Sequence, residues 1–299
     1  MTSHNRANLT SRCLEKLHTI TQATDIDLHV ILVDAGSTDN TPEHARAAFP
    51  AITVISVTGN VYWAEGMAIA EKHALEDENL SDDDVLVWLN DDVFLDDDAF
   101  ERAIDWFTEV NAQQNCIVVG AMRSSTGTVT FGGLKRKRWN PLGIRLIEPT
   151  TEPVPVDTFH GNFLLVPVIV AKAISGIDGH FGHHMADIDY GVRNSALGNE
   201  NILLPGTYGV CDFGGPEFST RLDAWRFYRS LKGSGHWPTR LHFMKKHSRI
   251  ARWPALIAMD ILHGIRLLRR LPARTVLDES QKVSESVGSQ VTRVPLRRR

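Results

Sequence analysis

Short apolar runs and amphipathic stretches alternate along residues 1–122, and this alternation predicts strands separated by helices. The apolar runs at 28–34 and 51–57 are typical of strands that are buried on both faces of a sheet. In residues 9–20, apolar side chains recur at helical spacing and predict an amphipathic helix. The pattern continues with helices at 42–49, 64–77 and 97–110 and strands at 85–90 and 116–122.

The order of these elements predicts an α/β fold with a mostly parallel central sheet and helices on both faces. Residues 123–156 carry Gly, Pro and a basic run, and they predict a hairpin or loop insertion in that fold. A strand is then predicted at 157–170 and a helix at 183–197. In sheets of this kind ligands bind beyond the carboxyl ends of the strands, so polar residues at those ends are the first candidates for a site.

The charge of the chain is divided between an acidic body and a basic end. The formal net charge is −4, but residues 221–299 hold 18 basic and 5 acidic side chains, which leaves a net charge of −17 on residues 1–220. Aromatic residues are interleaved with the basic ones, and residues 255–271 predict an amphipathic helix with a cationic end. We therefore expect a domain at 1–220, a basic helical region at 221–275 and a disordered tail at 276–299.

Composition and cysteine spacing exclude several classes of protein. With 42% apolar and 23% charged residues, the chain has the composition of a globular protein and not of a disordered or collagen-like one. The three cysteines form no C-x-x-C pair, which favours a reducing cytoplasm over a disulfide-bonded secreted protein. No signal peptide and no run of about 20 apolar residues is visible. The acidic body argues against nucleic acid as a partner.

A candidate metal site follows the predicted strand at 85–90, in the sequence VWLNDDV. Asp91 and Asp92 stand where that strand ends. Two carboxylates this close repel each other unless a cation neutralises them. Their hard oxygen atoms suit Mg²⁺ or Mn²⁺, which also bind substrate phosphates. The alternative is a pair of solvated loop acids, and the apolar run before them favours the metal site.

Two further groups of acidic residues stand at the ends of predicted elements. Asp34 ends a strand in the sequence VDAGSTDNT, where it either accepts hydrogen bonds from a nucleobase or ribose or belongs to a plain strand–turn–helix connection. Asp187 and Asp189 stand in the sequence HMADIDYGVR, where a carboxylate near a bound cation can act as a general base. A helix cap with an Asp189–Arg193 pair explains Asp189 well and leaves Asp187 free.

These segments occur in one order with three others, and the ordered set resembles a known family. The set comprises SHNR at 3–6, VDAGSTDNT at 33–41, YWAEGM at 62–67, WLNDDV at 88–93, FHGNFLL at 159–165 and ADIDYGVR at 186–193. It resembles the family 2 inverting glycosyltransferases of the GT-A fold, particularly bacterial rhamnosyltransferase-like members that act on surface polysaccharides. The similarity runs from about residue 3 to residue 212.

The resemblance implies a binding site for a nucleoside diphosphate sugar donor. The residues that match the family's nucleotide- and sugar-binding positions are Asn5, Asp34, Trp63, Glu65, Gly66, Asn90, Asp91, Gly161 and Asn162. Among them, Asn5 and Asp34 would line the nucleobase and ribose pocket. Gly161 and Asn162 would form a loop between the donor and the acceptor.

The resemblance also implies a divalent metal and a catalytic base. Asn90, Asp91 and Asp92 match the family's D-x-D element, in which Asp92, assisted by Asp91, would bind Mg²⁺ or Mn²⁺ at the diphosphate. Asp187 matches the base, with Asp189 as the second candidate. The implied reaction is inverting transfer of a sugar to a polysaccharide or lipid-linked glycan acceptor, by a cytoplasmic enzyme of cell-envelope polysaccharide biosynthesis.

The sequence departs from the family at several positions. Ala186 stands where relatives often carry an acid before the base, and Asn90 stands at the first position of the D-x-D element. Cys211 and Asp212 are the nearest residues to the place where relatives often supply a His ligand. Since only two residues precede the SHNR segment, we expect the family's first strand to be missing.

Two other functions fit the sequence less closely. A sugar nucleotidyltransferase uses a similar sheet but normally carries a Gly-rich N-terminal loop, which this sequence lacks. A non-catalytic protein that binds sugar nucleotides or glycans is the alternative that a missing first strand would favour. The basic C-terminal region predicts either contact with an anionic membrane surface, peripheral on the inner face of the cell membrane, or packing against the acidic domain.

Overall fold

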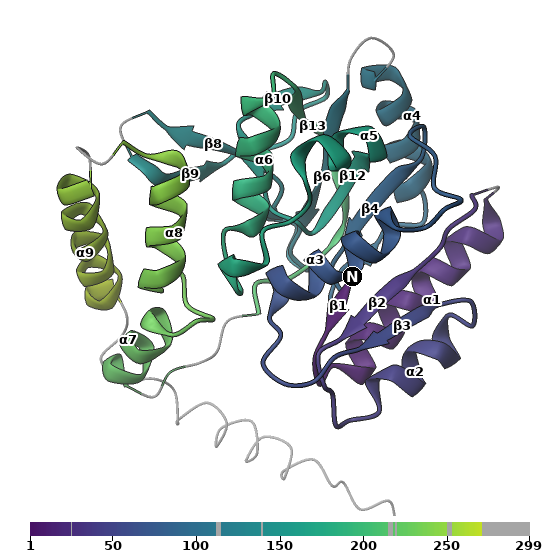
Figure 1. Cartoon of the computed structure of the whole chain (residues 1–299), viewed down its shortest axis with the longest axis horizontal. Coiled ribbons are helices and arrows are strands. Elements are labelled where there is room, and N and C mark those ends of the chain that lie inside the picture. Colours follow the sequence, from purple (N-terminus) through teal and green to yellow (C-terminus); the bar gives the residue numbers. More distant parts are fainter. Residues whose placement is uncertain are drawn as a thin grey trace, which may run out of the picture.

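A computed structural model describes residues 1–24, 26–111, 115–138, 140–214, 218, 220–249 and 253–270. Figure 1 shows a small N-terminal sheet with its helices, a larger central sheet, and a group of C-terminal helices. The predicted tail at 276–299 lies outside the described residues.

Three parallel strands form the N-terminal sheet, in the order β1–β2–β3. The strands are β1 (Thr2–Ser3), β2 (Ile31–Asp34) and β3 (Thr53–Ser56), and the helices between and after them are α1 (Ala7–Ala23), α2 (Thr41–Ala48) and α3 (Trp63–Leu75). β3 lies at the edge of this sheet, and its residues are exposed or half-buried. The prediction that 51–57 is buried on both faces is therefore wrong, because an edge strand has a neighbour on one side only.

A short first strand is present where the sequence predicts none. Thr2 and Ser3 pair in parallel with Val33 and Asp34. The carbonyl of Met1 also accepts a hydrogen bond from the N–H of Val33 at 3.0 Å. Two residues are too few for an alternating or apolar pattern to be visible, since strands usually span 3–10 residues. The expectation of a missing first strand is thus corrected to a strand of two residues.

The central sheet has seven strands, and its main path runs β10–β13–β6–β12–β4. The strands are β4 (Val85–Leu89), β5 (Phe94–Leu95), β6 (Cys116–Arg123), β7 (Val129–Phe131), β10 (Val154–Val156), β12 (Phe163–Pro167) and β13 (Glu200–Val210). β13 is parallel to β6, whereas β12 is antiparallel to both of its neighbours, β4 and β6. The predicted α/β fold is confirmed, and β4, β6 and β13 share one direction. β5, β7, β10 and β12 run antiparallel to their partners, which periodicity does not reveal.

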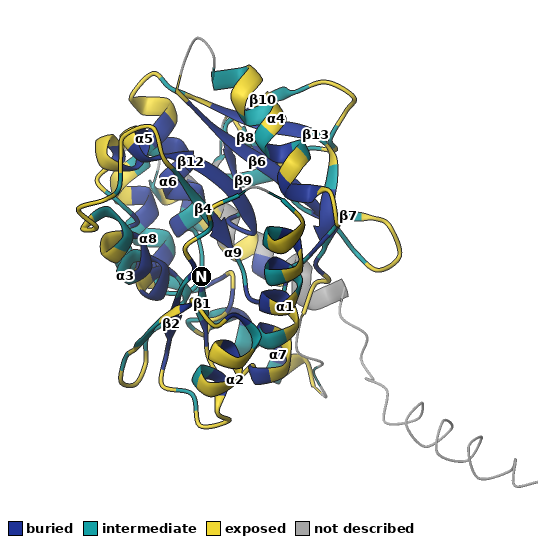
Figure 2. Ribbon diagram, turned by 90° about the vertical axis from the view of Figure 1, so that its right-hand side faces the viewer, coloured by how far each residue is buried: buried dark blue, intermediate teal, exposed yellow. Residues whose placement is uncertain are grey.

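Two hydrophobic cores cover opposite faces of the central sheet. In β6, Cys116, Val118 and Met122 pack into the core that includes α1, while Ile117 and Val119 pack into the core that includes α3. This alternation is what a strand with both faces buried requires. Figure 2 shows the central strands buried and the outer faces of the helices exposed. The remaining helices over this sheet are α4 (Ala99–Asn111), α5 (Val168–Ile174) and α6 (Ala186–Ala196).

The predicted insertion at 123–156 is a set of hairpin strands. β8 (Gly133–Lys137) pairs in antiparallel fashion with β9 (Asn140–Leu146) and with β11 (Thr158–Phe159). The prediction of a single strand at 157–170 is wrong in part. These residues form β11, β12 and the beginning of α5 at Val168. Val168 and Val170 of α5 are buried in the same core as β12, and an apolar run alone does not separate a buried strand from a buried helix.

The C-terminal helices follow β13 and include the predicted helix at 255–271. They are α7 (Arg221–Arg229), α8 (Trp237–His247) and α9 (Trp253–Arg270). α8 is bound to Asp178, just before the 3₁₀ helix η1 (Gly179–Phe181), since Asp178 Oδ2 lies 2.7 Å from Lys246 Nζ and 2.8 Å from His242 Nε2. Among the described helices, none combines the length and the hydropathy that crossing a membrane requires.

Gly191 of α6 sets how closely this helix approaches β11. A Cβ at position 191 would lie 2.5 Å from Thr158 Oγ1 and 2.9 Å from Thr158 Cα. We expect Gly191→Ala to lower the free energy of unfolding by about 1–2 kcal/mol, because the backbone clash outweighs the helix propensity that alanine gains. Denaturant titration measures the change. Gly214→Ala is the matched control, since a Cβ there meets no heavy atom within 4 Å, and equal losses in the two variants would contradict the prediction.

Candidate active site

The turns that follow β1 and β2 are bound to each other at the carboxyl end of the N-terminal sheet. Asn5, whose backbone φ is 52°, accepts at Oδ1 a hydrogen bond from the N–H of Thr38 at 2.8 Å. In return, the Asn5 N–H donates to the Ser37 hydroxyl at 2.9 Å. Asp34 is 3% exposed and accepts a hydrogen bond from the N–H of Ser37 at 3.3 Å. The two residues predicted to line a nucleoside pocket are thus brought to one pair of turns.

Trp63 joins the end of β4 to the loop before β12. Its indole Nε1 donates to Asn90 Oδ1 at 2.8 Å, and the Asn90 N–H donates to the carbonyl of Asn162 at 3.2 Å. A Cβ at Gly161 would lie 2.8 Å from the Trp63 ring, so a side chain at this position would push the indole away. Four of the residues predicted to bind the donor are therefore in one contact network.

Glu65 and Gly66 stand in the first turn of α3 and have different surroundings. Glu65 is exposed. Gly66 is buried, and a Cβ there would lie 2.4 Å from Thr2 Oγ1. The absence of a side chain at Gly66 lets α3 pack closely against β1.

Asp91 and Asp92 share one cation, the guanidinium of Arg6. A single atom, Arg6 Nη1, lies 2.9 Å from Asp91 Oδ1 and 2.9 Å from Asp92 Oδ2. Thr10 also donates to Asp91 Oδ2 at 3.3 Å. Burial raises the pKa of Asp91, and the charge of Arg6 works in the opposite direction. The charge of Arg6 and the hydrogen bond from Thr10 thus offset the cost of burying Asp91, which is 4% exposed.

The two carboxylates fit a hard divalent cation, because both already face one cation position and offer oxygen ligands. Asp92 is the more open of the two, with a side chain 33% exposed against 6% for Asp91. Among the residues that the structure describes, no three His, Cys, Asp or Glu side chains form a group that could hold a metal ion. Mg²⁺ or Mn²⁺ at this place would therefore complete its shell with water and phosphate oxygens, which is how Mg²⁺ is usually bound.

Cys211 lies beside Asp92 at the end of β13. Its Sγ is 3.7 Å from Asp92 Oδ1 and accepts a hydrogen bond from Asn162 Nδ2 at 3.5 Å. Burial, followed by the negative charge of Asp92, raises the pKa of the Cys211 thiol to about 12. At neutral pH the thiol is therefore protonated and acts as a donor to Asp92. Asp212 instead accepts a hydrogen bond from the N–H of Ser125 at 2.9 Å.

Asp187 lies in the first turn of α6 and reaches the loop at Gly161. Its Oδ2 accepts a hydrogen bond from the Gly161 N–H at 3.0 Å, and its Oδ1 accepts one from the Ile188 N–H at 2.8 Å. The chain enters this helix through Met185, whose φ is 73°. Since Gly161 also contacts Trp63, Asp187 belongs to the same network as the predicted donor site.

His160 is a neighbour of Asp187 that the sequence did not single out. Burial lowers the pKa of His160, and the charge of Asp187 opposes this effect. Its Nδ1 is buried and has no hydrogen-bond partner among the described residues. A neutral imidazole therefore stands beside the candidate base.

Asp189 is fully buried and is bound to the C-terminal helix α8. Its Oδ2 accepts a hydrogen bond from Arg193 Nε at 2.7 Å, and its Oδ1 lies 2.8 Å from Lys246 Nζ and 2.7 Å from His247 Nε2. Burial works to raise the pKa of Asp189, but the hydrogen bonds from His247 and Lys246 outweigh it, so that the pKa is lowered. The predicted Asp189–Arg193 pair within α6 is confirmed, and the contacts with Lys246 and His247 join α6 to α8.

Arg6 and Thr10 are contacts of the acidic pair that the sequence did not indicate, whereas Cys211, named with Asp212 as nearest to the place of the family's His ligand, lies beside Asp92. A signal for Arg6 was available, because two adjacent carboxylates at a strand end require a nearby cation. Arg6 stands in the SHNR segment, at the carboxyl end of β1. Its partner acids are more than 80 residues away, so the sequence does not indicate which cation they use.

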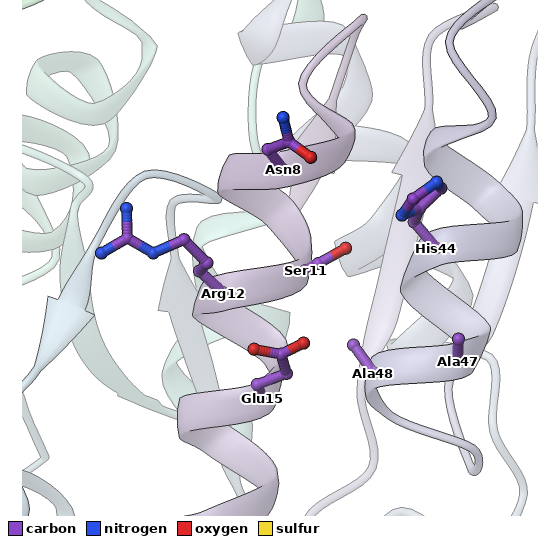
Figure 3. Close-up of a pocket in the computed structure, with 7 residues that line it drawn as sticks. All are labelled: Asn8, Ser11, Arg12, Glu15, His44, Ala47 and Ala48. Carbon is purple, nitrogen blue, oxygen red and sulfur yellow. The ribbon is translucent and has the colours of Figure 1, made fainter. Parts of the chain in front are cut away.

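A surface cavity of about 360 Å³ lies between α1 and α2 and is separate from this network. It is lined by Asn8, Ser11, Arg12, Glu15, His44, Ala47 and Ala48. Figure 3 shows Ser11 and His44 pointing toward the gap between the helices, while Arg12 extends away from α2. None of the predicted site residues lines this cavity, so the candidate site is the network at the strand ends.

Glu71 connects the helix that carries Trp63 to the helix that carries Asp187. Its side chain is buried, and its Oε2 accepts a hydrogen bond from the Ile177 N–H at 2.7 Å. Its Oε1 accepts one from the Tyr190 hydroxyl at 2.8 Å. Burial raises the pKa of Glu71 to about 7 despite these hydrogen bonds. Ionisation of this carboxyl therefore places a buried negative charge between α3 and α6 and weakens their packing.

Comparison with known proteins gives one family and a set of similar folds. The model of Glycosyl transferase family 2 matches residues 1–169. TarS 1–349 of S. aureus in complex with UDP-GlcNAc is similar with a TM-score of 0.51 and 12% identity, over 86% of this chain and 77% of that chain. GalNAc-T7 with UDP, GalNAc and Mn²⁺ is similar with a TM-score of 0.51 and 12% identity, over 87% and 56% of the two chains.

The extent of these similarities limits them to the fold. This chain spans 62% of another TarS 1–349 structure and 38% of a longer TarS structure. At such identities the neighbours share an architecture with this chain, and their ligands are their own. No curated protein matches this chain.

The Glu71 carboxyl predicts a pH dependence of stability. Its pKa of about 7 in the folded chain lies above the ordinary value of 4.5. The free energy of unfolding should therefore fall by on the order of 3 kcal/mol as pH rises from about 4.5 through about 7, because ionisation disfavours the folded state. Glu71→Gln removes the charge, while its amide can accept from Ile177 and donate to Tyr190. We expect this variant to lack that decline and to be more stable than the wild type at pH 8.

Denaturant titrations at pH 4 to pH 8 measure both profiles. Glu65→Gln is the control, because Glu65 is exposed on the same helix and its replacement should leave the wild-type profile unchanged. Parallel profiles for the wild type and Glu71→Gln would show that Glu71 does not ionise in this range.

Proposed function

This chain belongs to glycosyl transferase family 2, and from that membership we propose that it transfers a sugar, with inversion, from a nucleoside diphosphate sugar to an acceptor hydroxyl. The acceptor we propose is a polysaccharide or lipid-linked glycan of the cell envelope. The observation that carries the proposal is the network that joins the Asn5 and Asp34 turns, the Asn90–Asp92 segment, Gly161 and Asp187. It combines a pair of joined turns, a cation position and a carboxylate in one contact network.

The donor would lie along this network with its nucleoside at the Asn5 and Asp34 turns and its diphosphate near Asp92. Asp91 and Asp92 would hold Mg²⁺ or Mn²⁺, which supplies positive charge for the departing diphosphate when it is bound. The Trp63 indole, oriented by Asn90 at 2.8 Å, offers an apolar face beside the Gly161 loop. UDP donors are the first to test, since the similar TarS structure is a UDP-GlcNAc complex and the GalNAc-T7 structure contains UDP and Mn²⁺.

Asp187 is the base in this proposal. It takes the proton of the acceptor hydroxyl while that oxygen forms its bond to the anomeric carbon and the bond to the diphosphate breaks. A single displacement of this kind inverts the configuration and needs no covalent nucleophile on the protein. The hydrogen bonds from the Gly161 and Ile188 N–H groups fix the carboxylate in one orientation. Asp189 is bound to Arg193, Lys246 and His247 and serves the fold.

Transfer assays with a panel of nucleotide sugars and Mg²⁺ or Mn²⁺ test this assignment. We expect Asp187→Asn to lower kcat by about 100-fold or more, because a general base contributes roughly that much. Asp92→Asn should lower kcat/KM with a similar magnitude and should weaken metal-dependent donor binding. Asp105→Asn on the exposed face of α4 is the control and should keep full activity.

Three other outcomes, one of them from calorimetry, would redirect the proposal. Full activity in both Asp187→Asn and Asp92→Asn would show that the site is elsewhere. Calorimetric binding of a nucleotide sugar without any turnover would favour a non-catalytic binding protein. Formation of a nucleotide sugar from a sugar phosphate and a nucleoside triphosphate would favour a nucleotidyltransferase.

We further propose that the C-terminal helices rest on an anionic membrane surface, where lipid-linked acceptors are found. One side of α9 packs on α7, since Leu256 is 1% exposed and a Cβ at Gly264 would lie 3.1 Å from Tyr228. Another side presents Ile261, Leu262 and Ile265 to the surroundings. The net charge of +13 on residues 221–299 favours such a surface, because each basic residue near it contributes about 1 kcal/mol.

Co-sedimentation with vesicles tests the membrane contact. We expect the full chain to bind vesicles that contain anionic lipid and to bind neutral vesicles at least about tenfold more weakly. Ile261→Ser with Ile265→Ser should reduce binding to the anionic vesicles, because the apolar side chains insert at the interface. Ile169→Ser is the control, since Ile169 is 44% exposed on α5. Binding that is indifferent to lipid charge and to these residues would contradict the proposal.

A further inference from the structure

The Arg6 guanidinium contacts both carboxylates of the acidic pair. Arg6 Nη1 is 2.9 Å from an oxygen of Asp91 and 2.9 Å from an oxygen of Asp92. These are charge-assisted contacts to two anions from one nitrogen atom. A divalent ion that used both carboxylates would need the position that this nitrogen fills.

The side chain of Arg6 is free to leave while its backbone stays in place. The Arg6 N–H donates to Thr41 Oγ1 at 3.3 Å, and its carbonyl accepts a hydrogen bond from the Thr10 N–H at 2.9 Å. The side chain is 45% exposed, against 6% for that of Asp91. The buried acid is therefore fixed, and its counter-ion is attached to an anchored Cα through a long and partly solvated stem.

Arg6 also lies near a group of basic residues around His183. Burial lowers the pKa of His183 to about 4, and the positive charges of nearby groups add to this effect. Those groups are His184, Lys232 and Arg6. Lys232 belongs to the segment between α7 and α8, and its carbonyl lies 2.6 Å from His184 Nε2. A displaced guanidinium is repelled by these like charges, and a diphosphate would relieve that repulsion as a charge-assisted partner stronger than water.

We propose that Arg6 is a resident counter-ion of Asp91 and Asp92 that keeps free divalent metal off the pair and yields its place when metal arrives together with a diphosphate. The released guanidinium then binds the diphosphate, so that metal and nucleotide bind cooperatively. This inference rests on the proposed function for the identity of the diphosphate, and it adds a positioning role for Arg6 with opposite effects on two binding steps. Removal of the guanidinium should strengthen the binding of metal alone and weaken the binding of nucleotide in the presence of metal.

Binding of Mn²⁺ to the full chain, followed by the electron paramagnetic resonance signal of free Mn²⁺, tests the first step without any turnover. Arg6→Gln should bind Mn²⁺ on the order of tenfold more tightly than the wild type, because a unit positive charge in contact with both carboxylates is removed. Arg6→Lys keeps that charge and should stay within about threefold of the wild type. Arg12→Gln, in the helix that follows Arg6 and with its guanidinium over the Phe94 ring, should bind Mn²⁺ as the wild type does.

The second step is measured by calorimetry with UDP at saturating Mn²⁺. We expect the Kd of UDP to rise about tenfold in Arg6→Gln, since a charge-assisted contact to the diphosphate is lost. Thermal unfolding with and without Mn²⁺ gives a second readout, and Mn²⁺ should raise the Tm of Arg6→Gln more than that of the wild type. The gain in Mn²⁺ affinity should vanish when Asp92→Asn is added to Arg6→Gln.

Three results would overturn the inference. They are an unchanged or weaker affinity of Arg6→Gln for Mn²⁺, a gain that persists in the double variant with Asp92→Asn, and an unchanged Kd for UDP. The Mn²⁺ experiments do not depend on transfer of a sugar. A chain that shows the exchange at Arg6 but transfers no sugar would therefore refute the proposed function and leave this inference standing.

Discussion

The candidate site depends on the compensation of two adjacent carboxylates at the end of β4. Asp91 is buried and Asp92 is partly open, and like charges so close together require a cation. Arg6 supplies it at 2.9 Å from both. Arg6 is in place only because the two residues of β1 pair with β2 and direct the following turn toward β4. A strand of only two residues thus positions the charge that compensates the acidic pair.

The same need for compensation joins the basic end of the chain to its acidic body. Asp178 and Asp189 flank the segment that contains η1, His183 and Asp187, and both acids lie within 2.8 Å of Lys246 Nζ. Breaking a buried ion pair by removing one partner typically costs a few kcal/mol. α8 therefore helps to hold the loop and helix that carry the proposed base. Part of the opposite charge of residues 1–220 and 221–299 therefore forms ion pairs inside the fold, while α9 leaves Ile261, Leu262 and Ile265 exposed.

The fold could be predicted from the sequence wherever an element has its own periodicity. The helix at 9–20 and the strands at 28–34, 85–90 and 116–122 were found in this way and are present in the structure. The predictions are wrong where the burial or the type of an element depends on the elements packed around it. β3 has the apolar pattern of a central strand but lies at an edge, and α5 continues the apolar run of β12 as a buried helix. β1 is too short to have any pattern, although it determines where the site is built.

The sequence by itself determined the residue types of the site and their order, and these were enough to indicate a nucleotide-sugar family. Only the tertiary structure decided what each acid contacts. Asp187 and Asp189 are two residues apart, and in a helix such residues point in different directions because each residue turns the chain by 100°. The sequence therefore implies that the two side chains point in different directions. Only the packing of α6 between the Gly161 loop and α8 shows which of them reaches the residues of the candidate site. Likewise, it contains Arg6 and the acidic pair, but their contact spans 85 residues and exists only in the folded chain.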